Sequence, residues 1–92
     1  MALTDAEITQ RLAGAGHWQR QGDAIVRELQ LADFAAAIAL VNRVAELAEA
    51  ANHHPDILVH GWNKVRLTLS THSQGALTDA DFALARQIDA VA

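Results

Sequence analysis

Histidines and a carboxylate gather in one short stretch of this chain. His53 and His54 are adjacent, Pro55 follows them, and Glu49 stands four residues before the pair. A third histidine, His72, lies 18 residues after His54. Imidazole has an unperturbed pKa of about 6.5, so it can accept or donate a proton near neutral pH. Histidines beside carboxylates are therefore suited to general acid–base catalysis.

Each of these residues also has a purely structural interpretation. A histidine pair before proline is common where a helix ends and leaves both imidazoles exposed. Glu49 on a helix face would ordinarily be solvated. Asp81 stands three residues after Thr78, which is the spacing of a helix cap. His17 and His60 fall in expected turns, and we expect them at the surface.

A metal site is the sharpest competing chemistry, because zinc accepts three histidines and a carboxylate. Adjacent histidines point in diverging directions, however, and the helical His-Glu-x-x-His spacing is absent. We therefore expect no metal and no cofactor. Nucleophilic catalysis is not expected either, because cysteine is absent and Ser70, Thr71 and Ser73 lack a nucleophile motif.

A long helix is predicted to lead into the histidine pair. Asp33 can cap its start, and it runs to about Asn52. Pro55 ends it, because a residue that precedes proline avoids the helical conformation. The predicted buried stripe consists of Phe34, Ile38, Val41, Ala45 and Ala48, and it is widened by Leu40, Val44 and Leu47.

Strands and two shorter helices complete the predicted fold. Capping patterns at Thr4 and Thr78 predict helices near the two ends of the chain. Alternation of apolar and polar residues predicts strands. These lie at residues 18–21, 24–31, 57–59 and 64–70. Arg27 interrupts the apolar side of its strand, as expected at an edge or over a pocket.

The predicted order is helix, two strands, long helix, two strands, helix. This order indicates an α+β domain with an antiparallel sheet and helices on one face. The last strand returns the chain toward the histidine pair and ends just before His72. We therefore expect three imidazoles to meet at one mouth, with Glu49 and Asp81 nearby.

Composition narrows the class of protein. The chain has 92 residues, no cysteine and a formal net charge of −4, so we expect one domain over residues 1–92 without disulfides. Lys and Arg form no cluster, so nucleic-acid binding is not expected. A membrane span is not expected, because no apolar run approaches about 20 residues.

The start of the chain and its small size suggest where and how the protein works. Residues 1–5 are acidic and quickly polar, unlike a signal peptide, so we expect a cytoplasmic protein. A domain this small often gains stability by association, and we expect a homo-oligomer.

At the histidine segment the chain resembles the pterin-4a-carbinolamine dehydratase family, known in animals also as a dimerisation cofactor of a homeodomain transcription factor. The resemblance rests on spaced positions, namely Glu49, His53-His54-Pro55, Trp62, His72 and Asp81. Similar segments elsewhere extend it over nearly the whole chain. One departure is local, since Ala76 stands where the family usually has glycine, with Gly75 one place earlier.

The resemblance implies a fold and an activity. The fold is a four-stranded antiparallel sheet with three helices on one face, assembled as dimers or pairs of dimers. The activity is dehydration of 4a-hydroxytetrahydropterin to quinonoid dihydropterin, downstream of aromatic amino-acid hydroxylases and without metal or redox cofactor. By position, His54 would be the main acid–base residue, and His53 and His72 would contact the pterin and assist proton transfer. The other implied substrate-site residues are Glu49, Asp81 and Trp62.

The resemblance leaves a second function open. The animal relatives also bind the dimerisation helices of a transcription factor, so a protein–protein interaction module is the alternative. We favour the enzyme, because an interaction module would not need three histidines with acidic neighbours.

Overall fold

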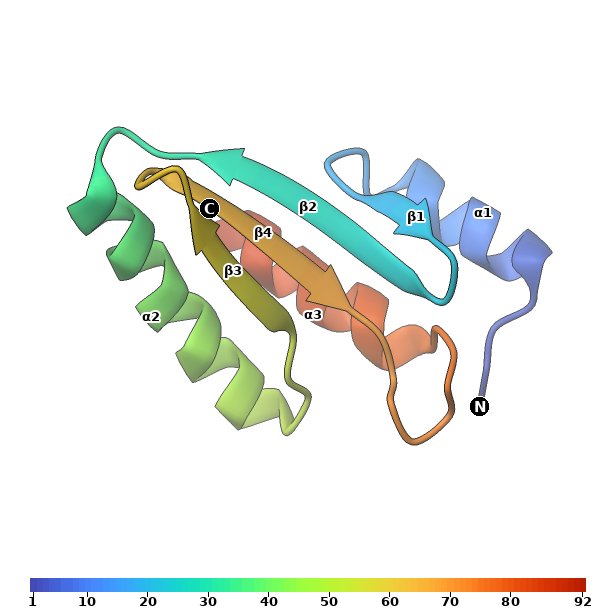
Figure 1. Cartoon of the computed structure of the whole chain (residues 1–92). Helices are drawn as coiled ribbons and strands as arrows, with labels where there is room; N and C mark the ends of the chain where they lie inside the picture. Colours follow the sequence, from blue (N-terminus) through green and yellow to red (C-terminus); the bar gives the residue numbers. More distant parts are fainter.

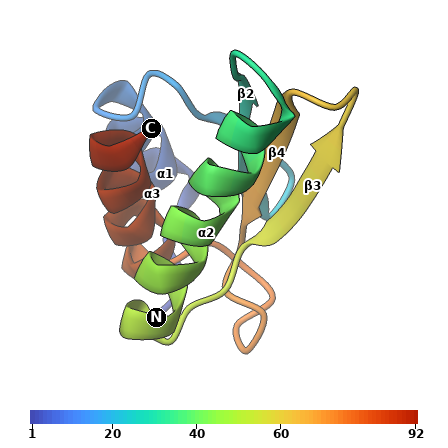
Figure 2. The same cartoon turned by 90° about the vertical axis from the view of Figure 1, so that its left-hand side faces the viewer.

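A four-stranded antiparallel sheet and three helices form two layers in the structure, a computed structural model that describes residues 1–92 (Figures 1 and 2). In chain order the elements are α1 (Asp5–Ala13), β1 (Gln19–Gln21), β2 (Ala24–Gln30), α2 (Phe34–Ala51), β3 (Asp56–His60), β4 (Lys64–Leu69) and α3 (Asp79–Val91). The strands are ordered β1-β2-β4-β3, and all neighbours are antiparallel. The predicted fold class and order of elements are confirmed.

The core lies between β4, β2 and the two longer helices. On β4, Val65, Leu67 and Leu69 are fully buried, and they alternate with outward residues as predicted. Figure 2 shows the helices together on one side of the sheet. The opposite face of the sheet is left open. This packing fixes the ends of α2, β3 and β4 relative to α3.

The buried stripe of α2 differs from the predicted one. The helix buries Ala37, Leu40, Val44 and Ala48. Phe34 is 55% exposed and Ile38 is 37% exposed, and Ala45 is also exposed, so these three assignments were wrong. The first eight residues of α2 are all apolar. Hydrophobicity therefore does not decide which side of this helix faces the sheet.

Arg27 lies on the helix side of an interior strand, not at an edge. One of its guanidinium nitrogens is 2.5 Å from Asp89 Oδ1 on α3. The indole Nε1 of Trp18 donates to the same oxygen over 2.9 Å. A cation on the core side of β2 is thus neutralised by a carboxylate from the packed helix.

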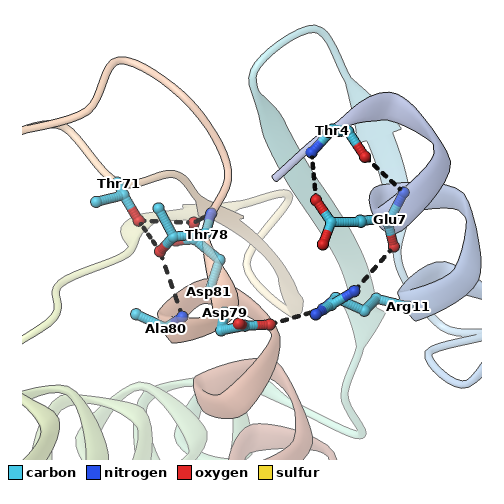
Figure 3. A network of polar contacts seen from close by, with 8 residues as sticks. All are labelled: Thr4, Glu7, Arg11, Thr71, Thr78, Asp79, Ala80 and Asp81. Carbon is cyan, nitrogen blue, oxygen red and sulfur yellow. Dashed lines mark hydrogen bonds and ion pairs between the residues drawn. The ribbon is translucent and has the colours of Figure 1, made fainter. Parts of the chain in front are cut away.

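The first helix is attached to the last. The predicted capping box of α1 is present, with the Thr4 hydroxyl accepting from the backbone of Glu7. Arg11 forms an ion pair of 2.6 Å with Asp79 at the start of α3 (Figure 3).

None of the helices combines the length and the hydropathy that a bilayer-crossing segment requires.

Candidate active site

The histidine pair begins where α2 stops. Asn52 takes a left-handed conformation (φ 49°), which asparagine tolerates better than most residues. Its backbone N–H donates to the carbonyls of the last helical turn, and the N–H of His53 donates to the Ala48 carbonyl. Pro55 then directs the chain into β3. The two imidazoles therefore leave the helix as its axis ends.

His53 is held by a buried carboxylate. Its Nε2 lies 2.5 Å from Asp81 Oδ1, and the Asp81 side chain is fully buried while that of His53 is 14% exposed. Against an ionised carboxylate, which only accepts hydrogen bonds, Nε2 of His53 would be the donor. In the neutral imidazole, Nδ1 is then the acceptor.

The second oxygen of the same carboxylate holds the start of α3. Asp81 Oδ2 accepts from the Thr71 hydroxyl over 2.8 Å and from the Thr78 backbone N–H over 2.9 Å. Because Thr71 donates to Asp81, the 2.7 Å contact between the two threonine hydroxyls is donated by Thr78 (Figure 3). Asp81 thus caps the start of α3 with one oxygen and contacts His53 with the other.

His54 is paired with Glu49 on the solvent side. Its Nε2 lies 2.5 Å from Glu49 Oε2, one turn back on α2. The side chains are 56% and 77% exposed, respectively. Donation from Nε2 to the carboxylate leaves Nδ1 as the acceptor of the neutral ring. A solvent-facing imidazole with one nitrogen held by a carboxylate is suited to proton transfer.

His72 reaches the same end of the sheet on a separate loop. In the register of β3 and β4, Asp56 stands opposite Thr68, so the start of β3 lies beside the end of β4. Thr71, which contacts Asp81, directly precedes the exposed His72. No group of three histidine, aspartate or glutamate side chains is placed to hold a metal ion.

The loop after His72 closes on itself. The backbones of Thr71 and Ala76 form a bridge, with the Thr71 N–H donating to the Ala76 carbonyl over 3.0 Å. Gly75 takes a positive φ of 59°, a conformation that glycine adopts without strain. Gly75, one place earlier than the usual glycine of the family, thus occupies the position whose backbone conformation favours glycine.

Trp62 lies at the other end of the β3–β4 hairpin. It is 62% exposed and takes a positive φ of 59°, which is uncommon for a bulky residue. The intervening β3 spans about 17 Å. A single chain therefore brings His53, His54, Glu49 and Asp81 into paired contacts, with the His72 loop beside them, and leaves Trp62 apart.

Thr71 was missed as a site residue. In the sequence its hydroxyl stands out only as a possible nucleophile, whereas in the structure it supports the carboxylate that holds His53. Its position between the end of a strand and a site histidine was the available signal. The contact itself depends on how β4 and α3 meet.

A pocket of about 240 Å³ lies elsewhere, on the open face of the sheet. Its lining residues are His17, Gln19, Gln21, Val26 and Glu28. The Arg66 hydrogen bond lowers the pKa of Glu28 below its usual range, and the hydrogen bond with His60 adds to this. None of the predicted site residues lines this pocket.

Comparison with known proteins identifies the family of this chain. Residues 1–91 match the sequence model of the family described as "Pterin 4 alpha carbinolamine dehydratase". A Roseiflexus castenholzii protein named "Putative pterin-4-alpha-carbinolamine dehydratase" is 55% identical over 89 residues, 97% of this chain and 95% of that protein. A protein of the same name from Nocardia farcinica is 54% identical over 90 residues, 98% of this chain and 94% of that protein.

Solved structures show the same fold. A "transcriptional coactivator/pterin dehydratase" from Brucella melitensis superposes with a TM-score of 0.94 at 33% identity, covering 100% of this chain and 99% of that one. A pterin dehydratase-like RuBisCO assembly factor of the alpha-carboxysome superposes with a TM-score of 0.65 at 24% identity, covering 80% and 84%, and shares the fold alone. From the match over residues 1–91 and these relatives, the chain belongs to the pterin-4-alpha-carbinolamine dehydratase family.

Proposed function

We propose that this protein is a hydro-lyase that dehydrates 4a-hydroxytetrahydropterin to quinonoid dihydropterin. The observation that carries the proposal is the pair of imidazole–carboxylate contacts, His53 with Asp81 and His54 with Glu49, at one end of the sheet. Family membership supports the same substrate class.

The reaction needs only acid–base chemistry. The proton on N5 leaves, the C4a–O bond breaks, the hydroxyl departs as water and a C=N bond forms between N5 and C4a. No electrons are exchanged with a cofactor in this step. A base at N5 and an acid at the hydroxyl are therefore sufficient.

The residues of the site divide this work. His54 is the proposed main acid–base residue, because its exposed ring can meet a substrate while Glu49 orients it. His53 is proposed to contact the pterin. Asp81, beside its Nε2, would fix which of the two ring nitrogens carries the hydrogen. His72, on the neighbouring loop, is proposed to assist proton transfer to the departing hydroxyl.

The direct test is a rate measurement on the wild-type protein. 4a-Hydroxytetrahydropterin is generated in the cuvette by an aromatic amino-acid hydroxylase, and its loss is followed by ultraviolet absorbance. We expect the dehydration rate to rise in proportion to the concentration of this protein. A folded protein that gives no acceleration over buffer would overturn the proposal.

The alternative is a protein–protein interaction module on the same fold. It is favoured by the exposed Phe34 and Ile38 on α2, and by a relative whose name includes the words transcriptional coactivator. Titration with a reduced pterin analogue, followed by NMR of the imidazole protons, separates the two functions. An enzyme should show shifts at His53, His54 and His72, whereas a module without a pterin site should show none.

A further inference from the structure

Thr71 connects two of the histidines of the candidate site. It follows the end of β4 and directly precedes His72. Its hydroxyl donates to Asp81 Oδ2 over 2.8 Å, and the other oxygen of that carboxylate lies 2.5 Å from His53 Nε2. The side chain of Thr71 therefore contacts the group that holds His53, while its backbone is joined to His72.

The backbone of Thr71 is fixed as well as its side chain. Its N–H donates to the Ala76 carbonyl over 3.0 Å, and its carbonyl accepts from the Gln74 N–H over 3.0 Å. Its hydroxyl also lies 2.7 Å from the Thr78 hydroxyl (Figure 3). Every hydrogen-bonding group of Thr71 is thus engaged, and a rotation of this residue would break contacts on both sides of the loop.

The three site histidines are held in different ways. His53 and His54 are each paired with a carboxylate. His72 is exposed and has no such partner. The place of its ring therefore depends on the backbone that carries it, which is anchored at Thr71.

We propose that Thr71 is a positioning residue of the candidate site, which holds His53 and His72 in place relative to each other. His54 does not depend on it, because its partner Glu49 lies nearby in the same segment of the chain. The inference rests on the proposed function, since the arrangement of the two rings affects a rate only where both meet one substrate.

Removal of the Thr71 hydroxyl should loosen both rings. Asp81 Oδ2 would keep the Thr78 N–H as its one remaining donor, so the carboxylate would turn more freely and hold His53 less well. The hydroxyl contacts of Thr71 both run to the start of α3. Without them the loop that carries His72 would lose its side-chain connection to that helix.

The kinetic test compares Thr71→Val with Thr71→Ser. Valine keeps the branched shape and removes the hydroxyl, whereas serine keeps the hydroxyl. Because a displacement of about 1 Å can cost about 100-fold in rate, we expect Thr71→Val to lower the kcat for dehydration by about tenfold or more. Thr71→Ser should restore most of this loss.

Thr68→Val is the matched control for the kinetic test. Thr68 is half-buried on β4, and it alternates with the inward residues of that strand, so its side chain lies on the open face of the sheet. The substitution makes the same chemical change without touching Asp81. Thr68→Val should therefore retain the wild-type kcat.

NMR of the imidazole groups separates positioning from a general loss of structure. In Thr71→Val the ring signals of His53 and His72 should shift, while the signals of His54 stay at their wild-type positions. Thr71→Ala is measured beside it, because its smaller side chain fits even where valine prevents folding. Unshifted His53 and His72 signals, shifts of all three histidines, or a wild-type kcat in the folded variant would overturn the positioning role.

The outcomes separate this inference from the proposed function. Shifted His53 and His72 signals in Thr71→Val, together with a wild-type protein that accelerates no dehydration, would overturn the proposed function and with it the effect of Thr71 on a rate. Full catalysis by both the wild type and Thr71→Val would overturn the positioning role alone.

Discussion

A single carboxylate joins the stability of this protein to its site. Asp81 is completely buried, and its two oxygens contact His53, Thr71 and the backbone of Thr78. Asp81 thus makes both the contacts of a helix cap and a contact with a histidine of the candidate site. The start of α3 and the orientation of His53 depend on the same group.

Asp81→Asn should weaken both. The amide keeps the shape but loses the charge that accepts three hydrogen bonds. Because hydrogen bonds to charged groups contribute about 1.5–3 kcal/mol, we expect a loss of about 2 kcal/mol in the free energy of unfolding, measured in urea. Asp79→Asn is the matched control on the same helical turn, where an exposed ion pair contributes about 1 kcal/mol or less. Equal losses in the two variants would contradict the role of Asp81.

The sequence could indicate the residues of the site but not their partners. His53 and Asp81 are 28 positions apart, and their contact depends on how the end of α2 meets the start of α3. The His54–Glu49 contact is local, since the two residues lie five positions apart across the end of α2, and it was within reach of sequence reasoning. The position of Trp62 was not, because a motif gives spacing along the chain and not across a hairpin.

At the scale of elements, α2 is the least predictable part of the fold. Its apolar residues continue around the helix, so the helical period identified an element but not its buried side. The regular alternation on β4 left no such choice, and its inward residues were predicted correctly. Element type follows from periodicity, whereas orientation depends on packing.

Alanine substitutions on α2 test its corrected orientation. Leu40 is fully buried, so Leu40→Ala should lower the free energy of unfolding by about 2–5 kcal/mol. Ile38→Ala, on the exposed side, is the control and should cost less than about 1 kcal/mol. Chemical denaturation of both variants decides this, and a larger loss for Ile38→Ala would restore the orientation predicted from sequence.

A charge cluster on the open face of the sheet predicts a pH effect. Glu28 accepts from Arg66, and this contact lowers its pKa below 4.5. A carboxyl whose pKa is lower in the folded state contributes stability above its ordinary pKa, and the contribution is lost as pH falls through the lowered value. In Arg66→Gln, an NMR titration should show the Glu28 pKa rising toward 4.5. An unchanged midpoint would contradict this cause.

At the scale of the whole molecule, Asp89 connects three separate segments. It lies near the end of α3 and contacts Arg27 on β2 and Trp18 in the segment before β1. The side chains of Arg27 and Asp89 are 12% and 24% exposed. In the sequence Arg27 is visible only as an interruption of an apolar strand face, because its partner lies 62 residues away along the chain.

Removing one member of this contact should cost more than removing both charges. Asp89→Ala leaves a largely buried guanidinium without a carboxylate, and we expect a loss of about 2–3 kcal/mol in the free energy of unfolding. Arg27→Met combined with Asp89→Ala should recover part of that loss. A double-mutant cycle in urea measures both, and additive losses would show that the two side chains do not interact.

The histidine end of the sheet is proposed to perform acid–base chemistry on a pterin. The most direct measurement compares the kcat for 4a-hydroxytetrahydropterin dehydration between wild type, His54→Ala and the surface control His17→Ala. Since general acid–base catalysis contributes about 10²–10⁴-fold, His54→Ala should lose about 100-fold or more while circular dichroism stays unchanged. His17→Ala should retain wild-type kcat. A folded His54→Ala protein with wild-type kcat would contradict the claim.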